Sequence, residues 1–223
     1  MASTALASPA LAKDDSWYIG AEFGSMLVED ADFDINDTTD AHEVSHDFGF
    51  DGGGYVGYDF GGFRLEAEVS YRQANIDGIT VGAPGLLVGT GFTRGPGFYN
   101  VDEGDVSSLS FMLNGLFDFG PDDGLQGYVG GGVGVARTSY EVSVNPTAAP
   151  SLDDSDSGLA WQALAGVRAP LTDNVDVGLR YRYFNAESVE LVDLSGNSLE
   201  DTFTSHSLMG TLSYNFGEPA APP

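Results

Sequence analysis

Eight segments of the chain alternate apolar residues with polar or small ones at every second position. In residues 63–72, FRLEAEVSYR, Leu65 and Val69 share one parity while charged and hydroxyl residues take the other. A period of two puts alternate side chains on opposite faces of a strand, whereas a helix repeats every 3.6 residues. The pattern therefore predicts an all-β chain. The other seven segments lie near residues 17–24, 55–60, 109–118, 125–135, 159–168, 175–183 and 207–216.

The connections between these segments alternate in length. Short ones follow Phe60, Phe119 and Ala169 and are rich in turn-forming residues. Long loops are expected at 29–46, 77–104, 141–157 and 191–204. Consecutive antiparallel strands with short turns at one end and long loops at the other form a meander, and closing the sheet removes its exposed edges. We therefore expect one domain, an eight-stranded antiparallel up-and-down β-barrel.

The apolar face of these strands carries the larger side chains, and the other face is rich in Gly and Ser. Because an eight-stranded barrel holds modest side chains inside, the bulky face is expected to point outward, as in a transmembrane barrel. A soluble lipocalin-like ligand-binding barrel is the alternative. Aromatic residues fall at two levels, which the two membrane interfaces select. The expected girdles are Trp17, Phe60, Phe63, Phe119 and Phe216 near the short turns, and Tyr71, Trp161 and Tyr183 near the long loops.

Charge is distributed unevenly between the two faces. The chain has 8 Lys+Arg against 34 Asp+Glu, a formal net charge of −26, so no nucleic-acid partner is expected. Ions in a narrow interior must be paired, because an isolated one bears a desolvation cost of several kcal/mol. We expect a salt-bridged polar interior, and a gated narrow pore is the alternative. By parity the inner face holds Glu22, Arg64, Glu66, Glu68, Arg72, Arg168, Arg180 and Arg182.

Metal and enzyme sites are weakly indicated. Residues 32–43 space their oxygen ligands as a calcium loop does, but Asp37 stands where such a loop needs glycine. A solvated acidic loop is therefore favoured, and no metal or cofactor is expected. No Ser–His spacing accompanies the three histidines, so no enzyme is expected, and His206 shares the outward parity of Leu208. The calcium-like ligands would be Asp32, Asp34, Asn36, Asp40 and Glu43.

The two ends of the chain differ from the middle. Residues 1–12 are small and apolar and end in Ala-Leu-Ala, which predicts the remnant of a signal peptide cleaved before Lys13. Residues 13–217 form the predicted barrel domain. Residues 218–223, EPAAPP, read as the start of a Pro/Ala-rich linker.

The chain resembles the transmembrane domain of the OmpA family of Gram-negative outer-membrane proteins over about residues 16–217. The resemblance rests on WYIGA at 17–21, GYVGYDFGGFRLEAEVSY at 54–71 and GTLSYNFG at 210–217. It implies an integral protein of the outer membrane, in contact with lipid and lipopolysaccharide. It also implies a last strand that the barrel-assembly machinery reads through Gly210, Tyr214 and Phe216, and a peptidoglycan-binding domain after the linker.

Two functions follow from this resemblance as expectations. The first is a structural barrel that anchors in the outer membrane and presents acidic loops outside the cell. The second is a narrow, porin-like diffusion channel.

Overall fold

The computed structural model of the protein describes residues 15–29, 31–35, 38–46, 48–81, 86–88, 92–95, 97–100, 103–121, 124–143, 152–192 and 198–217. All of its regular elements over these residues are β-strands. Among them there is no helix long and apolar enough to cross a membrane.

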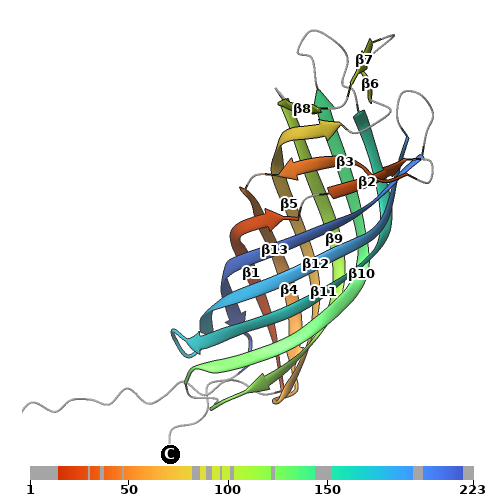
Figure 1. Ribbon diagram of the computed structural model, residues 1–223. Coiled ribbons are helices and arrows are strands. Elements are labelled where there is room, and N and C mark those ends of the chain that lie inside the picture. Colours follow the sequence, from red (N-terminus) through yellow and green to blue (C-terminus); the bar gives the residue numbers. More distant parts are fainter. Residues whose placement is uncertain are drawn as a thin grey trace, which may run out of the picture.

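Eight antiparallel strands close into a barrel (Figure 1), as the sequence predicts. Each of these eight strands pairs with the one that follows it among the eight, and β1 pairs with β13 to close the sheet. The wall consists of β1 (Ser16–Val28), β4 (Phe48–Asp59), β5 (Phe63–Val81), β9 (Glu103–Phe119), β10 (Gln126–Ser143), β11 (Leu152–Pro170), β12 (Val175–Val192) and β13 (Ser198–Asn215). Five short strands extend it at one end: β2 (Ala31–Ile35), β3 (Thr38–His46), β6 (Leu86–Val88), β7 (Phe92–Arg94) and β8 (Gly97–Asn100).

The three short turns lie together at the lower end of the barrel in Figure 1. In the first, Phe60 N donates to Phe63 O at 2.9 Å and Gly61 N donates to the Asp59 carboxylate at 2.8 Å. Gly61 has a φ of 95°, a conformation that glycine adopts without strain. Chain closure occurs at the same end, where Phe216 N donates to Trp17 O at 2.9 Å.

The prediction that the four long connections are loops was largely wrong, because strands continue into all four of them. β2 and β3 occupy most of 29–46, β5 reaches Val81, β11 begins at Leu152 and β13 at Ser198. In these stretches the period of two is short or interrupted: residues 31–35 alternate over five positions only, and residues 76–81 do not alternate, so the signal for strands is weaker there. The backbone groups still pair with the neighbouring strand, since every N–H and C=O needs a partner.

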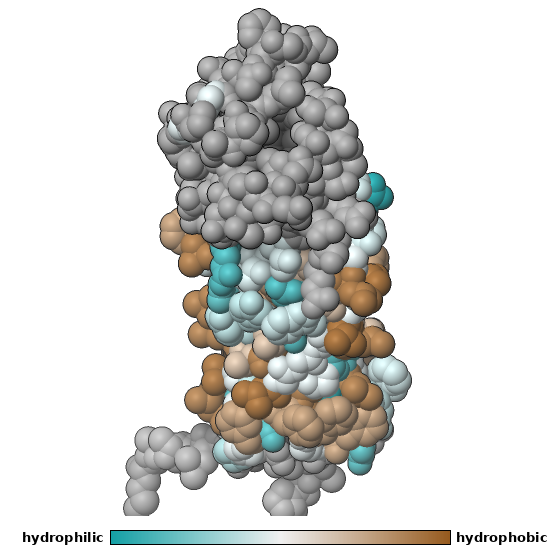
Figure 2. Space-filling view, turned by 45° about the vertical axis from the view of Figure 1, so that its right-hand side comes forward, coloured by the Kyte–Doolittle hydropathy of each residue, from teal (hydrophilic) through white to brown (hydrophobic). Residues whose placement is uncertain are grey.

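The apolar face points outward, as predicted. Leu113, Val133 and Leu159 are 69%, 67% and 70% exposed, and their neighbours in sequence face the interior. Figure 2 shows brown, apolar side chains along both edges of the described wall and in a row near its lower end. The inner face is bulkier than the Gly and Ser pattern suggests, because Tyr18, Tyr128 and several arginines are buried there.

Candidate functional site

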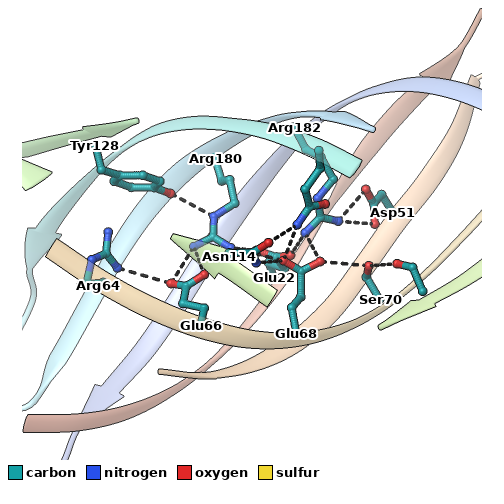
Figure 3. Close-up of polar contacts among 12 residues, drawn as sticks. Glu22, Asp51, Arg64, Glu66, Glu68, Ser70, Asn114, Tyr128, Arg180 and Arg182 are labelled. Carbon is teal, nitrogen blue, oxygen red and sulfur yellow. Dashed lines mark hydrogen bonds and ion pairs between the residues drawn. The ribbon is translucent and has the colours of Figure 1, made fainter. Parts of the chain in front are cut away.

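The interior of the barrel contains a continuous chain of alternating acidic and basic side chains, which we call the charge ladder; Figure 3 shows its central part. Each of its members is within 4.0 Å of an oppositely charged neighbour, and their side chains are at most 10% exposed. Since the members come from six strands, the ladder ties distant parts of the wall together. Its members are Glu22, Asp51, Asp59, Arg64, Glu66, Glu68, Arg72, Asp118, Arg168, Arg180 and Arg182.

The lower half of the ladder begins beside the short turns. Arg168 lies 3.0 Å from Asp59 and 3.7 Å from Asp118. Arg64 donates to both oxygens of Asp118, at 2.7 and 2.9 Å, in the bidentate geometry that suits a guanidinium. Arg64 also lies 3.4 Å from Glu66, which carries the ladder into the centre of the barrel.

The upper half is built around two arginines of β12. Arg180 donates to Glu66 at 3.1 Å and to Glu22 at 2.9 Å, across the barrel. Arg182 donates to Glu22, to Glu68 at 2.7 Å and to both oxygens of Asp51 at 2.9 Å. Arg72 at the top of the ladder pairs with Asp51 alone, and each of the other charges in this half pairs with more than one opposite charge.

Neutral side chains complete the ladder. Tyr18 donates to Glu66 at 2.9 Å, and Tyr128 accepts from Arg180 at 3.1 Å. Asn114 and Gln162 donate to the same oxygen of Glu68, at 2.8 and 3.1 Å. These contacts satisfy hydrogen-bonding groups that would otherwise raise the cost of burying the ions.

Glycines on the inner face make room for these large side chains. A Cβ on Gly57 would overlap the ring of Tyr18, and one on Gly166 would overlap Tyr128. In each case the register places the glycine directly across from the aromatic residue on the neighbouring strand. The small residue therefore lets the ring lie flat against the wall, so that the interior can be filled by arginine and tyrosine.

An apolar layer lies beyond the ladder, toward the long connections. Phe184 and Phe203 are in contact edge to face with their centroids 6.2 Å apart, and the Arg72 guanidinium lies 3.6 Å from the Phe184 ring centroid. All members of the layer are at most 2% exposed. We call this layer the apolar cap: Met26, Ala74, Val106, Phe184 and Phe203.

The structure places all eight interior charges expected from parity in the ladder and adds three carboxylates to them. Arg72 pairs with Asp51 at 3.6 Å, although an acid on β5 is nearer in sequence. Asp59 and Asp118 share the inward parity of their strands, so the sequence contains the signal for them. Asp51 is followed by three glycines, which interrupt the alternation of apolar and polar residues in the first half of β4. The strand expected from sequence therefore begins after these glycines and does not include Asp51.

The aromatic residues expected at two levels are on the outer face. Trp17, Phe60, Phe119 and Phe216 are more than half exposed, and Tyr71 and Trp161 about two fifths. Phe63 and Tyr183 are half-buried because neighbouring rings cover them. On the last strand, Tyr214 and Phe216 lie side by side with centroids 5.2 Å apart.

His206 lies on the outer face between two hydrogen-bonding partners. Its Nδ1 is 2.7 Å from the Tyr181 hydroxyl, and its Nε2 is 2.7 Å from the Glu29 carboxylate. Ser205 and Ser207 beside it are buried, so neither shares its face.

The acidic segment 32–43 forms part of the β2–β3 hairpin, with Asp32 opposite Glu43 in the register. Asn36 and the side chains of the other calcium-like candidates lie outside the described residues, as do the expected signal-peptide remnant at 1–12 and the linker at 218–223. In the part of the chain that the structure describes, no cluster of three His, Cys, Asp or Glu residues fits a metal ion.

Known proteins resemble this chain in sequence. It is 28% identical over 155 residues to outer membrane protein PagN of Salmonella typhimurium, a match covering 64% of this chain and 59% of PagN. It is 27% identical over 159 residues to opacity protein opA57 of Neisseria gonorrhoeae, which covers 58% of this chain and 67% of that protein. The chain thus spans less than two thirds of PagN.

Two solved structures share the fold across nearly their whole length. Neisserial surface protein A superposes with a TM-score of 0.52 at 17% identity, covering 90% of this chain and 97% of that one. OprG from Pseudomonas aeruginosa superposes with a TM-score of 0.55 at 14% identity, covering 93% and 100%. At these identities the likeness is one of fold.

The family described as the outer membrane protein beta-barrel domain matches residues 1–216. That range includes the whole closed barrel, with its apolar wall outside and its charges inside. The chain is therefore an integral outer-membrane β-barrel and belongs to the outer membrane protein beta-barrel domain family.

Proposed function

We propose that this protein is a structural outer-membrane barrel that does not conduct ions and that presents acidic extracellular loops. The observation that carries the proposal is the charge ladder, which runs through the interior from Asp59 to Arg72 and in which every member is paired with an opposite charge. The apolar cap adds a second barrier, because apolar side chains across the interior oppose the passage of hydrated ions. A barrel filled in this way serves as an anchor.

The proposed anchor would have three kinds of partner: the lipids of the membrane, the machinery that assembles the barrel, and peptidoglycan. Lipopolysaccharide and lipid would surround the apolar wall, and the barrel-assembly machinery would read the last strand. Gly210, Tyr214 and Phe216 are all exposed on the outer face of that strand, which supports this role. By analogy with the OmpA family, residues 218–223 would lead to a domain that binds peptidoglycan.

We infer no enzymatic activity for the barrel. His206 has Tyr181 and Glu29 as partners, and the nearest serines in sequence face the interior. The three side chains at 29, 181 and 206 connect the residue that follows β1 with the middle of β12 and β13 on the outer face, which is a structural role.

A narrow diffusion channel is the second candidate function. It is favoured by the continuity of the ladder, since a polar path that runs along the interior can exchange its ion pairs for water. In this case the ladder would act as a gate, and neutralising one member would open it.

Conductance in planar bilayers distinguishes these functions. We expect wild-type protein and Glu22→Gln to be silent, with Glu29→Gln on the exposed end of the same strand as the control. Conductance by Glu22→Gln alone would support the gated channel. Conductance by the wild type would contradict the closed barrel.

A further inference from the structure

A groove of about 730 Å³ crosses the outer face of β4, β5 and β9. It lies on the lipid side of the wall, because Val56, Leu65 and Leu113 line it and are 41%, 49% and 69% exposed. Its volume falls within the range of ~300–1,000 Å³ that is typical of small-molecule sites. Glu66, whose side chain belongs to the charge ladder inside the barrel, also lines the groove, so only the thickness of the wall separates the groove from the ladder.

The strand register explains why the wall is hollow at this position. Tyr58 lies opposite Leu65, and Leu65 lies opposite Gly115, so the row of side chains ends at a residue that has none. In the next row, Ala67 lies between Val56 and Leu113. The two small residues at 67 and 115 therefore form a depression, with Val56, Leu65 and Leu113 around it and the ring of Phe63 beside Gly115, where a Cβ would lie 3.3 Å from the ring.

The lower end of the groove has a different chemistry. Trp17, Tyr58 and Phe60 form one wall, with ring centroids 5.3 Å apart between the first two and 4.6 Å between the last two. Asp15 lines the groove beyond them, immediately before β1, and is exposed. Tryptophan and tyrosine favour the level where lipid headgroups meet the hydrocarbon region. Asp15 thus places a negative charge at headgroup level.

We propose that this groove binds one phospholipid, with an acyl chain lying over Ala67 and Gly115 and a cationic headgroup amine against Asp15. The groove is continuous with the apolar wall that faces the membrane, so acyl chains are what surrounds it. Bacterial outer-membrane barrels place their short turns on the periplasmic side, where the leaflet consists of phospholipids. A carboxylate beside the aromatic wall favours a lipid with an ammonium group over one with net negative charge.

The test measures lipids retained by the purified full chain. Protein reconstituted with equal amounts of phosphatidylethanolamine and phosphatidylglycerol is released into mild detergent and analysed by native mass spectrometry. We expect the wild type to keep one phosphatidylethanolamine per barrel.

Two variants address the acyl chain. Ala67→Phe fills the groove and should lower retention at least about tenfold, the change expected when two buried methylenes lose their contacts. Ala163→Phe is the matched control, because Ala163 is exposed on the outer face of β11, outside the groove, and this variant should retain lipid as the wild type does. Heat-modifiable gel mobility selects folded protein in both cases. Equal retention by the two variants would overturn the proposal.

The headgroup is tested separately with Asp15→Asn. This variant should retain the two phospholipids equally, because the negative charge that distinguishes them is gone. An unchanged preference for phosphatidylethanolamine would refute the role of Asp15. A mass of two chains without lipid would show that a second copy occupies the groove, which would overturn the proposal as a whole.

Discussion

At the scale of single residues, the two faces of the wall obey different rules. On the outer face the surroundings are lipid, so a side chain is tolerated according to its polarity. On the inner face the space is fixed by the opposite wall, so a side chain is tolerated according to its size. Leu179 and Gly57 represent the two rules, since one is 54% exposed and the other faces the ring of Tyr18.

Leu179→Arg tests the outer face. A cation on the lipid side near the midplane should destabilise the barrel by about 2–4 kcal/mol. The free energy of unfolding would be measured by urea titration in lipid vesicles. Leu179→Ala is the control and should cost much less, because it removes apolar surface without adding charge. Equal losses for the two variants would show that residue 179 does not contact lipid.

Gly57→Ala tests the inner face. The new methyl group would overlap the Tyr18 ring and approach Leu65 O at 2.9 Å, so we expect a loss of about 1–3 kcal/mol in the same titration. Gly210→Ala serves as the control, since its Cβ has Phe23 O as its nearest atom, at 3.9 Å. If both substitutions were equally tolerated, the inner ring could not be packed as described.

At the scale of elements, the ladder joins strands that share no backbone hydrogen bonds. β12 lies opposite β4 and β5 in the barrel, yet Arg182 reaches Asp51 and Glu68. Hydrogen bonds between neighbouring strands hold the wall together, and the ladder adds contacts between strands that lie opposite each other.

Glu22→Gln tests this cross-barrel support. The change leaves Arg180 and Arg182 each without one of their carboxylates, and breaking a buried pair typically costs about 3–5 kcal/mol. Glu29→Gln, near the end of the same strand, alters a carboxylate that is 54% exposed and should cost at most about 1 kcal/mol. Thermal unfolding in detergent would rank the two. Similar losses would mean that the ladder contributes little to the fold.

The sequence predicts the strands where lipid imposes a period of two, and it fails where that constraint ends. Parity was sufficient to place Arg64, Glu66 and Arg180 inside. It did not reveal β2 and β3, because the alternation of Ala31, Phe33 and Ile35 with acidic residues is short, and an acidic segment of this kind favours a loop. Nor could parity identify partners across the barrel, such as Asp51 for Arg72, since these depend on strand tilt and stagger.

At the scale of the whole molecule, closure depends on the seam between β1 and β13. This pairing joins the two ends of the barrel in sequence and runs from Tyr18 opposite Asn215 to Val28 opposite Ser205. Within it, Gly24 lies opposite Met209, and a Cβ there would overlap the backbone of Leu208.

Gly24→Val should therefore impair closure. An overlap with backbone cannot be relieved by a rotamer change, so we expect a cost of about 3 kcal/mol, the upper end for overpacking. The fraction of protein with the faster, heat-modifiable gel mobility should fall. Ala21→Val, opposite Leu212 in the same seam and exposed on the outer face, should fold normally. Normal folding of both variants would contradict a tightly packed seam.

The ladder also determines where the charge of the molecule resides. Its five arginines and six carboxylates carry a net charge of −1, which leaves −25 of the chain's −26 outside the ladder. Since five of the seven arginines are used inside, few cations remain to offset the carboxylates elsewhere. Such a surface gathers a counterion atmosphere whose thickness is ~8 Å at physiological ionic strength. The distance at which two of these barrels begin to repel each other is thus set by the surrounding salt.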